Sequence, residues 1–304
     1  MARTPEPPLV PEAEQVYLDH LGIFVPDLPP VAESLGRLGF ASTPFAKHGN
    51  APSTEGAPAP SGTANICAMF RAGYLEVLGP TGEDTPLARQ LADRLERHPG
   101  LHLIAFSVAN SPAHRARLND AGFDPVSLVR LRRTVPTPDG EASARFDVLR
   151  VPPATMPEGR IQLVTHHTPA LVWQPRFLDH ENGTQALTGA LVCAEDVGES
   201  RARFGRVTGR DGGARARALD LDRGRVDFVT PAQLSDALPE ATVPALPFVA
   251  AAAFAVSEIA ATRRLLKARG VDHLDTDDGR LIVSGDAALG ASLVFHQSGT
   301  DPWS

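Results

Sequence analysis

The sequence predicts an α+β fold built from four copies of a strand–helix–strand–strand–strand module. Two observations carry this prediction. The strand-like stretch 18–25, which reads Leu-Asp-His-Leu-Gly-Ile-Phe-Val, recurs at 101–108 as Leu-His-Leu-Ile-Ala-Phe-Ser-Val. Each stretch is followed by a helix-like segment that runs into a Gly-Phe pair, at 39–40 and at 122–123. Self-similarity at such a period indicates a repeated structural unit.

The composition is that of a globular protein, and it excludes two classes of partner. Of the 304 residues, 42% are hydrophobic and 21% are charged, with a net charge of -7. A nucleic-acid surface needs a clustered positive footprint, so no nucleic acid is expected. The longest apolar stretch, 247–256, is too short to span a bilayer, which takes about 20 residues. The two cysteines lie far apart in apolar stretches, which favours free thiols in a reducing, cytoplasmic compartment.

The first module is predicted to follow a disordered arm over residues 1–15, which is rich in Pro and Glu. It begins with a strand over 17–25. Its later segments are a helix with apolar residues Val31, Leu35 and Leu38, a Pro/Gly-rich loop over 48–62, and strands over 64–70 and 74–78. The helical spacing of the apolar residues and the turn residues around the strands support these assignments.

A connecting helix over 85–97 leads to the second module, which starts at Leu101. Its expected helix covers 112–121, and its strands lie near 126–133, 144–150 and 160–165. An ordered linker over 166–184 follows, anchored by burial of Trp173 and Phe177. The third and fourth modules open at Leu187 and Phe248, and the last strand is 291–296.

Two strand positions carry polar residues that could do chemistry. Near the start of the opening strand the first two modules have His20 and His102, and in the closing strand they have Glu76 and Gln162. The third and fourth modules have Thr188 or Gly189 with Asp227, and Ala252 with Leu293, at the corresponding positions. Two imidazoles and a carboxylate suit a divalent transition metal. The sequence therefore predicts one site in the first half of the chain.

This repeated unit, with His at the opening strand and Glu in the closing strand, resembles the vicinal oxygen chelate superfamily. That superfamily includes glyoxalase I, extradiol dioxygenases, fosfomycin-resistance enzymes and bleomycin-binding proteins. The stretch from His20 to His180 is similar, more narrowly, to glyoxalase-like domain proteins. The residues behind this likeness are Leu18-Asp19-His20, the run from Gly100 to Phe106, and the run from Thr168 to Pro175 with His180 and Asn182-Gly183.

The resemblance implies that the modules pair into cupped, partly closed mixed sheets whose concave face holds the site. Residues 16–184 would form the glyoxalase-like domain, and 185–304 a degenerate second pair. The superfamily's metal ligands fall on His20, Glu76, His102 and Gln162, for zinc, nickel, iron or manganese. Open metal positions would hold vicinal oxygens of a small-molecule substrate. Glu76, Gln162 and His166 are the expected catalytic residues of a lyase- or isomerase-type proton transfer.

Several alternatives stay open at this point. Gln162 departs from the acidic ligand common in metal-dependent members, so a metal-free protein that binds or sequesters a small molecule is the main rival. An extradiol-type dioxygenase is weaker, because the C-terminal modules lack the required histidines and glutamate. His20 and His102 could be core histidines bonded to backbone carbonyls, and Arg132 and Arg133 could bind a substrate carboxylate or lie on the surface. The first two modules could pair within one chain or across a homodimer.

Overall fold

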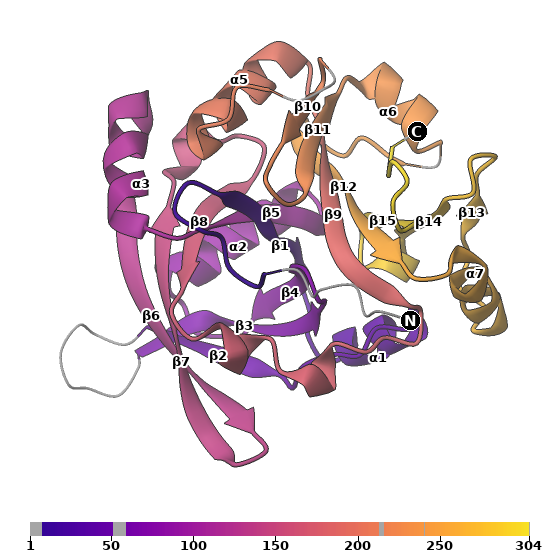
Figure 1. The fold of residues 1–304 in the computed structure, drawn as a ribbon, viewed down its shortest axis with the longest axis horizontal. Helices are drawn as coiled ribbons and strands as arrows, with labels where there is room; N and C mark the ends of the chain where they lie inside the picture. The colour runs from indigo at the N-terminus through magenta and orange to yellow at the C-terminus, as the bar shows by residue number, and fades with distance from the viewer. Residues whose placement is uncertain (1–7, 51–58, 213–215, 240, 304) are drawn as a thin grey trace.

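The chain forms two mixed sheets, which confirms the predicted α+β class and its cupped, paired modules. The computed structural model describes residues 8–50, 59–212, 216–239 and 241–303. The predicted arm therefore lies outside the described residues over 1–7. Figure 1 shows the first half of the chain, from indigo to magenta, beside the second half, from orange to yellow.

The first module and the second module supply one eight-stranded sheet, in the order β2-β3-β4-β1-β5-β8-β7-β6. The elements of the first are β1 (Val16–Phe24), α1 (Val31–Arg37), β2 (Ala46–Asn50), β3 (Ala59–Met69) and β4 (Tyr74–Pro80), followed by α2 (Pro86–Arg97). Those of the second are β5 (Gly100–Val108), α3 (Ser111–Leu118), η1 (Asn119–Phe123), β6 (Ser127–Thr137), β7 (Gly140–Arg150), η2 (Pro153–Thr155) and β8 (Arg160–His166).

A short linker leads to the second, seven-stranded sheet, in the order β10-β11-β9-β12-β15-β14-β13. The linker holds α4 (Pro169–Val172) and η3 (Pro175–Phe177). The third module comprises β9 (Thr184–Cys193), α5 (Val197–Thr208), β10 (Ala218–Asp220), β11 (Arg225–Val229) and α6 (Pro231–Ala237). The fourth comprises β12 (Phe248–Val256), α7 (Ile259–Ala268), β13 (Leu274–Asp275), β14 (Leu281–Gly285), η4 (Asp286–Ala288) and β15 (Ala291–Gln297).

Helix starts follow from local sequence. Thr85 caps α2, since its side chain accepts a hydrogen bond from the backbone N–H of Ala88, and Pro86 occupies the first turn. Asp196 caps α5 in the same way through Glu199 N–H. A loop was expected over 48–62, but residues 48–50 belong to β2 and 59–62 to β3, and the two strands pair with one another. The rest of that prediction, over 51–58, lies outside the described residues.

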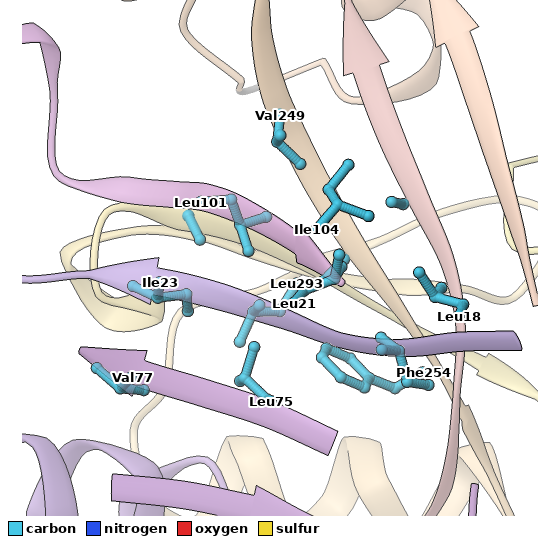
Figure 2. Packing of buried hydrophobic residues seen from close by; sticks show 14 of the residues in the cluster. Leu18, Leu21, Ile23, Leu75, Val77, Leu101, Ile104, Val249, Phe254 and Leu293 are labelled. Carbon is cyan, nitrogen blue, oxygen red and sulfur yellow. The ribbon is translucent and has the colours of Figure 1, made fainter. Parts of the chain in front are cut away.

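One face of the eight-stranded sheet packs against the seven-stranded sheet. Figure 2 shows Leu21 and Ile23 of β1, Ile104 of β5, and Val249 and Phe254 of β12 among the packed apolar side chains of one region. These side chains are fully or almost fully buried and belong to one apolar cluster. Burial of apolar area on this scale is the main favourable term that joins the two halves of the chain.

The other face of the eight-stranded sheet curls into a nearly closed cup. Its two edge strands, β2 and β6, meet across the opening, where the Arg133 guanidinium donates to the carbonyl oxygen of Gly49 at 2.5 Å. Because side chains alternate between the two faces of a strand, every second residue of β4, β7 and β8 points into the cup. This face positions the candidate site.

Candidate functional site

The cup encloses a cavity of about 770 Å³, which is lined by residues from all eight strands of the sheet. A cavity of this size suits a small organic molecule. Three of the predicted site residues, His20, Glu76 and Gln162, line it. The structure therefore brings together three residues that lie 56 to 142 positions apart in the chain.

His20 is held by its neighbour in sequence, Asp19. The strand pairing shifts between Leu18 and His20, so Asp19 is the extra residue of a β-bulge and its side chain turns toward the imidazole. Asp19 Oδ2 lies 2.7 Å from His20 Nδ1, and Asp19 Oδ1 lies 3.0 Å from Nε2 of His166. With Nδ1 donating to Asp19, the Nε2 atom of a neutral His20 carries the lone pair and faces the cavity. Asp19 thus fixes the tautomer of His20.

The Asp19 carboxylate is completely buried between these two histidines. Burial alone would raise the pKa of Asp19, but the charges and hydrogen bonds of His166 and His20 outweigh it and hold that pKa well below its usual range. Asp19 is therefore ionised at neutral pH. The ring of Tyr74, on the neighbouring strand β4, stacks on His20 with centroids 4.3 Å apart.

Glu76 stands across from His20, with its Oε2 atom 3.6 Å from His20 Nε2. Its other oxygen accepts a hydrogen bond of 2.6 Å from the Asn65 amide and lies 3.9 Å from His48 Nε2. Burial raises the pKa of Glu76, yet His20, His48, Asn65 and Arg160 together bring it below its ordinary value. The carboxylate is thus charged and close to the imidazole.

Gln162 and His166 lie on the same face of β8. The Gln162 amide nitrogen is 3.4 Å from His20 Nε2, while its Oε1 atom is buried and has no hydrogen-bond partner among the described residues. His166 does not line the cavity: it lies behind Asp19, against the ring of Trp173 at 4.8 Å. His166 is placed to position Asp19 and does not reach the cavity itself.

The structure does not bring His102 to the cavity. Leu21 of β1 pairs directly with Ile104 of β5. If these two residues are taken as equivalent positions of the two modules, the residue before Ile104, Leu103, is the counterpart of His20. His102 lies one residue earlier. A shift of one residue in a strand moves a side chain to the opposite face, so the predicted equivalence of the two histidines needs correction here.

His102 instead forms a structural contact near the end of α2. Its Nε2 atom lies 2.7 Å from the carbonyl oxygen of His98, and its ring stacks on the His98 ring at 4.1 Å. The ring of Phe24 lies 5.3 Å away. Burial is the largest cause that lowers the pKa of His102 to about 3, with the charges of His98, Arg94 and Arg97 adding to it.

Replacing His102 by phenylalanine is expected to reduce the acid sensitivity of folding. A histidine has a pKa of about 6.5 when unfolded, and His102 has about 3 when folded, so the unfolded state binds more protons between these values. Stability is therefore lost as pH falls from about 6.5 toward 3. Urea unfolding at pH 7 and pH 4 should show a smaller loss for His102→Phe than for the parent. The exposed His167, changed to phenylalanine, is the control. Equal losses in the parent and His102→Phe would contradict the assignment.

Three arginines give the cavity a positive wall. Arg133 on β6, Arg150 on β7 and Arg160 on β8 all line it. Burial is the main cause that lowers the pKa of each, to about 10 for Arg160, so all three stay charged at neutral pH. The nearby charges of Arg133 and Arg160 add to burial in lowering the pKa of His48 to about 4, which keeps that imidazole neutral.

The residues present do not make up the metal ligand set that the resemblance implies. Catalytic zinc sites use three protein ligands. Of the implied set, His102 lies outside the cavity and Gln162 offers a neutral amide beside His20 and Glu76. His48 approaches Glu76 only at 3.9 Å, from the oxygen opposite the one near His20, and its Nδ1 atom contacts the Thr63 hydroxyl. Across the described ranges, no group of three or more His, Cys, Asp or Glu side chains is arranged to hold a metal ion. The arginine wall also disfavours a divalent cation. We therefore derive no step through a metal.

The remaining predicted residues have structural roles. His180 Nε2 donates to the carbonyl oxygen of Met69 at 2.7 Å, and Asn182 donates to that of Leu38 at 2.9 Å. In the second sheet, Asp227 forms an ion pair of 2.7 Å with Arg225. None of these three residues lines the cavity.

Sequence reasoning missed several residues of the site. Asp19 sits beside His20, so strict alternation assigns it to the opposite face, although one acid in an apolar strand was a signal that it needed a partner. His48 lies in the segment expected to be a loop. Arg150 and Arg160 became candidates only when the pairing of β7 with β8 placed them around Gln162.

Comparison with known proteins gives one family. Residues 18–208 match the sequence profile of the glyoxalase-like domain, which is 191 of the 304 residues. No curated protein matches. Among the helices that the structure describes, none is long and apolar enough to cross a membrane.

Solved structures resemble the chain over most of its length. A hypothetical protein from Staphylococcus aureus has a TM-score of 0.57 and 10% identity, covering 93% of this chain and 99% of its own. A mutant of 4-hydroxymandelate synthase from Streptomyces coelicolor has a TM-score of 0.56 and 14% identity, covering 95% of each chain. A fusion of a xylose isomerase-like TIM barrel with 4-hydroxyphenylpyruvate dioxygenase has a TM-score of 0.55 and 15% identity, covering 97% of this chain and 51% of the fusion protein. At such identities the likeness shows the fold alone.

Proposed function

The chain belongs to the glyoxalase-like domain family, and from that premise we propose that it moves a proton on a small molecule with adjacent oxygens, bound in the cup. The observation that carries this proposal is the buried Asp19–His20 pair, whose second imidazole nitrogen, Nε2, faces the cavity 3.6 Å from the Glu76 carboxylate. A positioned imidazole that faces a second titratable group is the usual equipment of general acid–base catalysis.

In the proposed reaction, His20 Nε2 takes a proton from a carbon next to a carbonyl group. The electron pair of that C–H bond moves onto the carbonyl oxygen, and an enolate forms. Asp19 stabilises the imidazolium that results, because its carboxylate already holds Nδ1–H at 2.7 Å. Return of this proton from His20 to the former carbonyl carbon, together with transfer of the proton of the adjacent hydroxyl group to the former carbonyl oxygen, completes an isomerisation. Glu76 is placed to relay the proton between the two oxygens. All of these groups belong to the chain itself.

The test follows exchange of substrate hydrogens with solvent. Hydroxyacetone, dihydroxyacetone, dihydroxyacetone phosphate and pyruvate are incubated with the protein in D₂O, and loss of the ¹H signal next to the carbonyl is measured by NMR. The parent should accelerate exchange of at least one compound, and Glu76→Gln should slow it about tenfold or more, since a general acid–base group contributes about 10²- to 10⁴-fold. Glu33→Gln, on exposed α1, should behave like the parent.

The same assay separates this mechanism from the metal-dependent enzyme expected from the sequence. Exchange should persist after treatment with EDTA, and metal analysis should find no stoichiometric metal. Loss with EDTA and recovery with zinc, nickel, iron or manganese would favour the metal-dependent mechanism. Acceleration of none of the four compounds would contradict the proposed function.

A protein that only binds a small molecule is the second candidate. The observation that favours it is Gln162, a neutral amide at the position where metal-dependent relatives carry an acidic ligand. Under this alternative the parent binds one of the compounds without accelerating its exchange. The cytoplasmic location and the homodimer stay predictions.

A further inference from the structure

Three guanidinium groups gather on one wall of the cavity. Arg150 pairs with Gln162 across the β7–β8 ladder, and Arg160 precedes Gln162 by two residues on β8. Directly paired residues, and residues two apart on a strand, share a face. Arg133 reaches the same cavity from β6 and donates to Gly49 of β2. The positive wall therefore surrounds the amide of Gln162.

These charges lack ion-pair partners among the described residues, although Arg133 donates one hydrogen bond to the Gly49 carbonyl oxygen. In the part of the chain that the structure describes, none of the three arginines forms an ion pair, and the Nε atom of Arg150 is buried with no hydrogen-bond partner. Glu76 is the buried carboxylate that faces them, and it already accepts from Asn65. Burying a charged group without a partner is costly. The wall thus has an excess of positive charge that a ligand can neutralise.

We propose that Arg133, Arg150 and Arg160 form a subsite for the carboxylate or phosphate group of the ligand. The guanidinium fork binds both groups through paired N–H···O bonds, which fixes the ligand's orientation as well as its charge. Gln162 lines the same cavity with its amide nitrogen 3.4 Å from His20, and its Oε1 atom, which has no hydrogen-bond partner among the described residues, can accept a hydrogen bond from a hydroxyl group. The reacting carbon would then lie beside His20 Nε2.

What this subsite implies about the substrate rests on the proposed function. It narrows the substrate to small organic acids or phosphate esters that carry adjacent oxygens. The arginines would also stabilise negative charge that develops on the substrate when its proton leaves, since preorganised donors in a dry site act strongly on such charge. The binding of an anionic group by these arginines can be tested whether or not the protein catalyses a reaction.

Binding of two matched pairs of compounds tests the subsite. Isothermal titration calorimetry compares pyruvate with hydroxyacetone, and dihydroxyacetone phosphate with dihydroxyacetone, in 50 mM NaCl. At least one anion should bind about tenfold or more tightly than its neutral partner, because a hydrogen bond to a charged group contributes about 1.5–3 kcal/mol. The tighter of the two anions identifies the recognised group as a carboxylate or a phosphate.

Variants locate the binding to the wall. Arg150→Gln should weaken binding of the anion about tenfold and change the affinity for the neutral partner by less than threefold. Arg145→Gln, an exposed arginine on the same strand, is the matched control and should bind the anion like the parent. Far-UV circular dichroism checks that each variant folds. If Arg150→Gln does not fold, the parent is titrated in 500 mM NaCl, where only anion binding should weaken.

Equal affinity for the anionic compounds and their neutral partners would overturn the subsite. It would also be overturned if the Arg150→Gln substitution did not weaken anion binding, or if, where that variant does not fold, added salt did not weaken it. The subsite and the proposed function can fail separately. Anion binding without hydrogen exchange in the parent would support the subsite and contradict the proposed function.

Discussion

Changing His20 to alanine is expected to slow solvent hydrogen exchange by about 10²- to 10⁴-fold, the usual contribution of a general base. In the structure the His20 imidazole lines the cavity and is oriented by an acid, since Asp19 holds its Nδ1 atom at 2.7 Å. Alanine removes the proton acceptor and leaves Glu76 without its neighbour. The NMR assay in D₂O measures the change directly.

His102→Phe is the matched control for this experiment. The repeat in the sequence suggests that the two histidines are equivalent, whereas the strand pairing puts Leu103 at the position of His20. Exchange by His102→Phe should therefore stay within twofold of the parent. Equal losses in both variants would contradict the corrected register, and an unchanged rate in His20→Ala would rule out His20 as the base.

Changing Asp19 to alanine is expected to lower the free energy of unfolding by about 3–5 kcal/mol, the range observed when one partner of a buried ion pair is removed. The Asp19 side chain is fully buried and accepts hydrogen bonds from both His20 and His166. Alanine leaves both of these ring nitrogens without a partner. Urea unfolding at pH 7 measures the loss. Asp93→Ala, an exposed acid on α2, should change stability by about 0.5 kcal/mol or less.

The contribution of Asp19 should depend on pH in a defined direction. Its folded pKa is depressed, chiefly by His166 against the opposing effect of burial, while its unfolded pKa is about 3.9. The unfolded state therefore binds the proton first as pH falls. The stabilisation is complete above about pH 4 and is lost as pH falls toward the folded pKa. The difference in stability between the parent and Asp19→Ala should accordingly be constant above about pH 5 and shrink as pH falls from about 4 to 3. A difference that stays constant would contradict the ionised state of Asp19.

Much of the fold follows from local sequence. The apolar strands, the turn residues that separate them and the recurrence of Leu18–Val25 at Leu101–Val108 identify the modules and their order. The strand of Glu76 was recognisable because a carboxylate within an apolar run requires a partner. The polar residues in the strands of the first two modules indicated a site in that half of the chain for the same reason. Apart from the recurrence of one stretch farther along the chain, these inferences use only residues that are near one another in the sequence.

The sequence by itself determined the α+β modules, the glyoxalase-like resemblance and the candidacy of His20, Glu76 and Gln162. Only the tertiary structure decided which side chains share the cavity. A bulge places the side chain of Asp19 beside His20. His102, in contrast, lies one residue out of register with His20, and its side chain does not line the cavity. Arg150 and Arg160 join the site through the pairing of β7, β8 and β5. The physical reason is that a strand alternates its side chains residue by residue, so one inserted residue reverses the face, and pairing between distant strands fixes where that insertion falls.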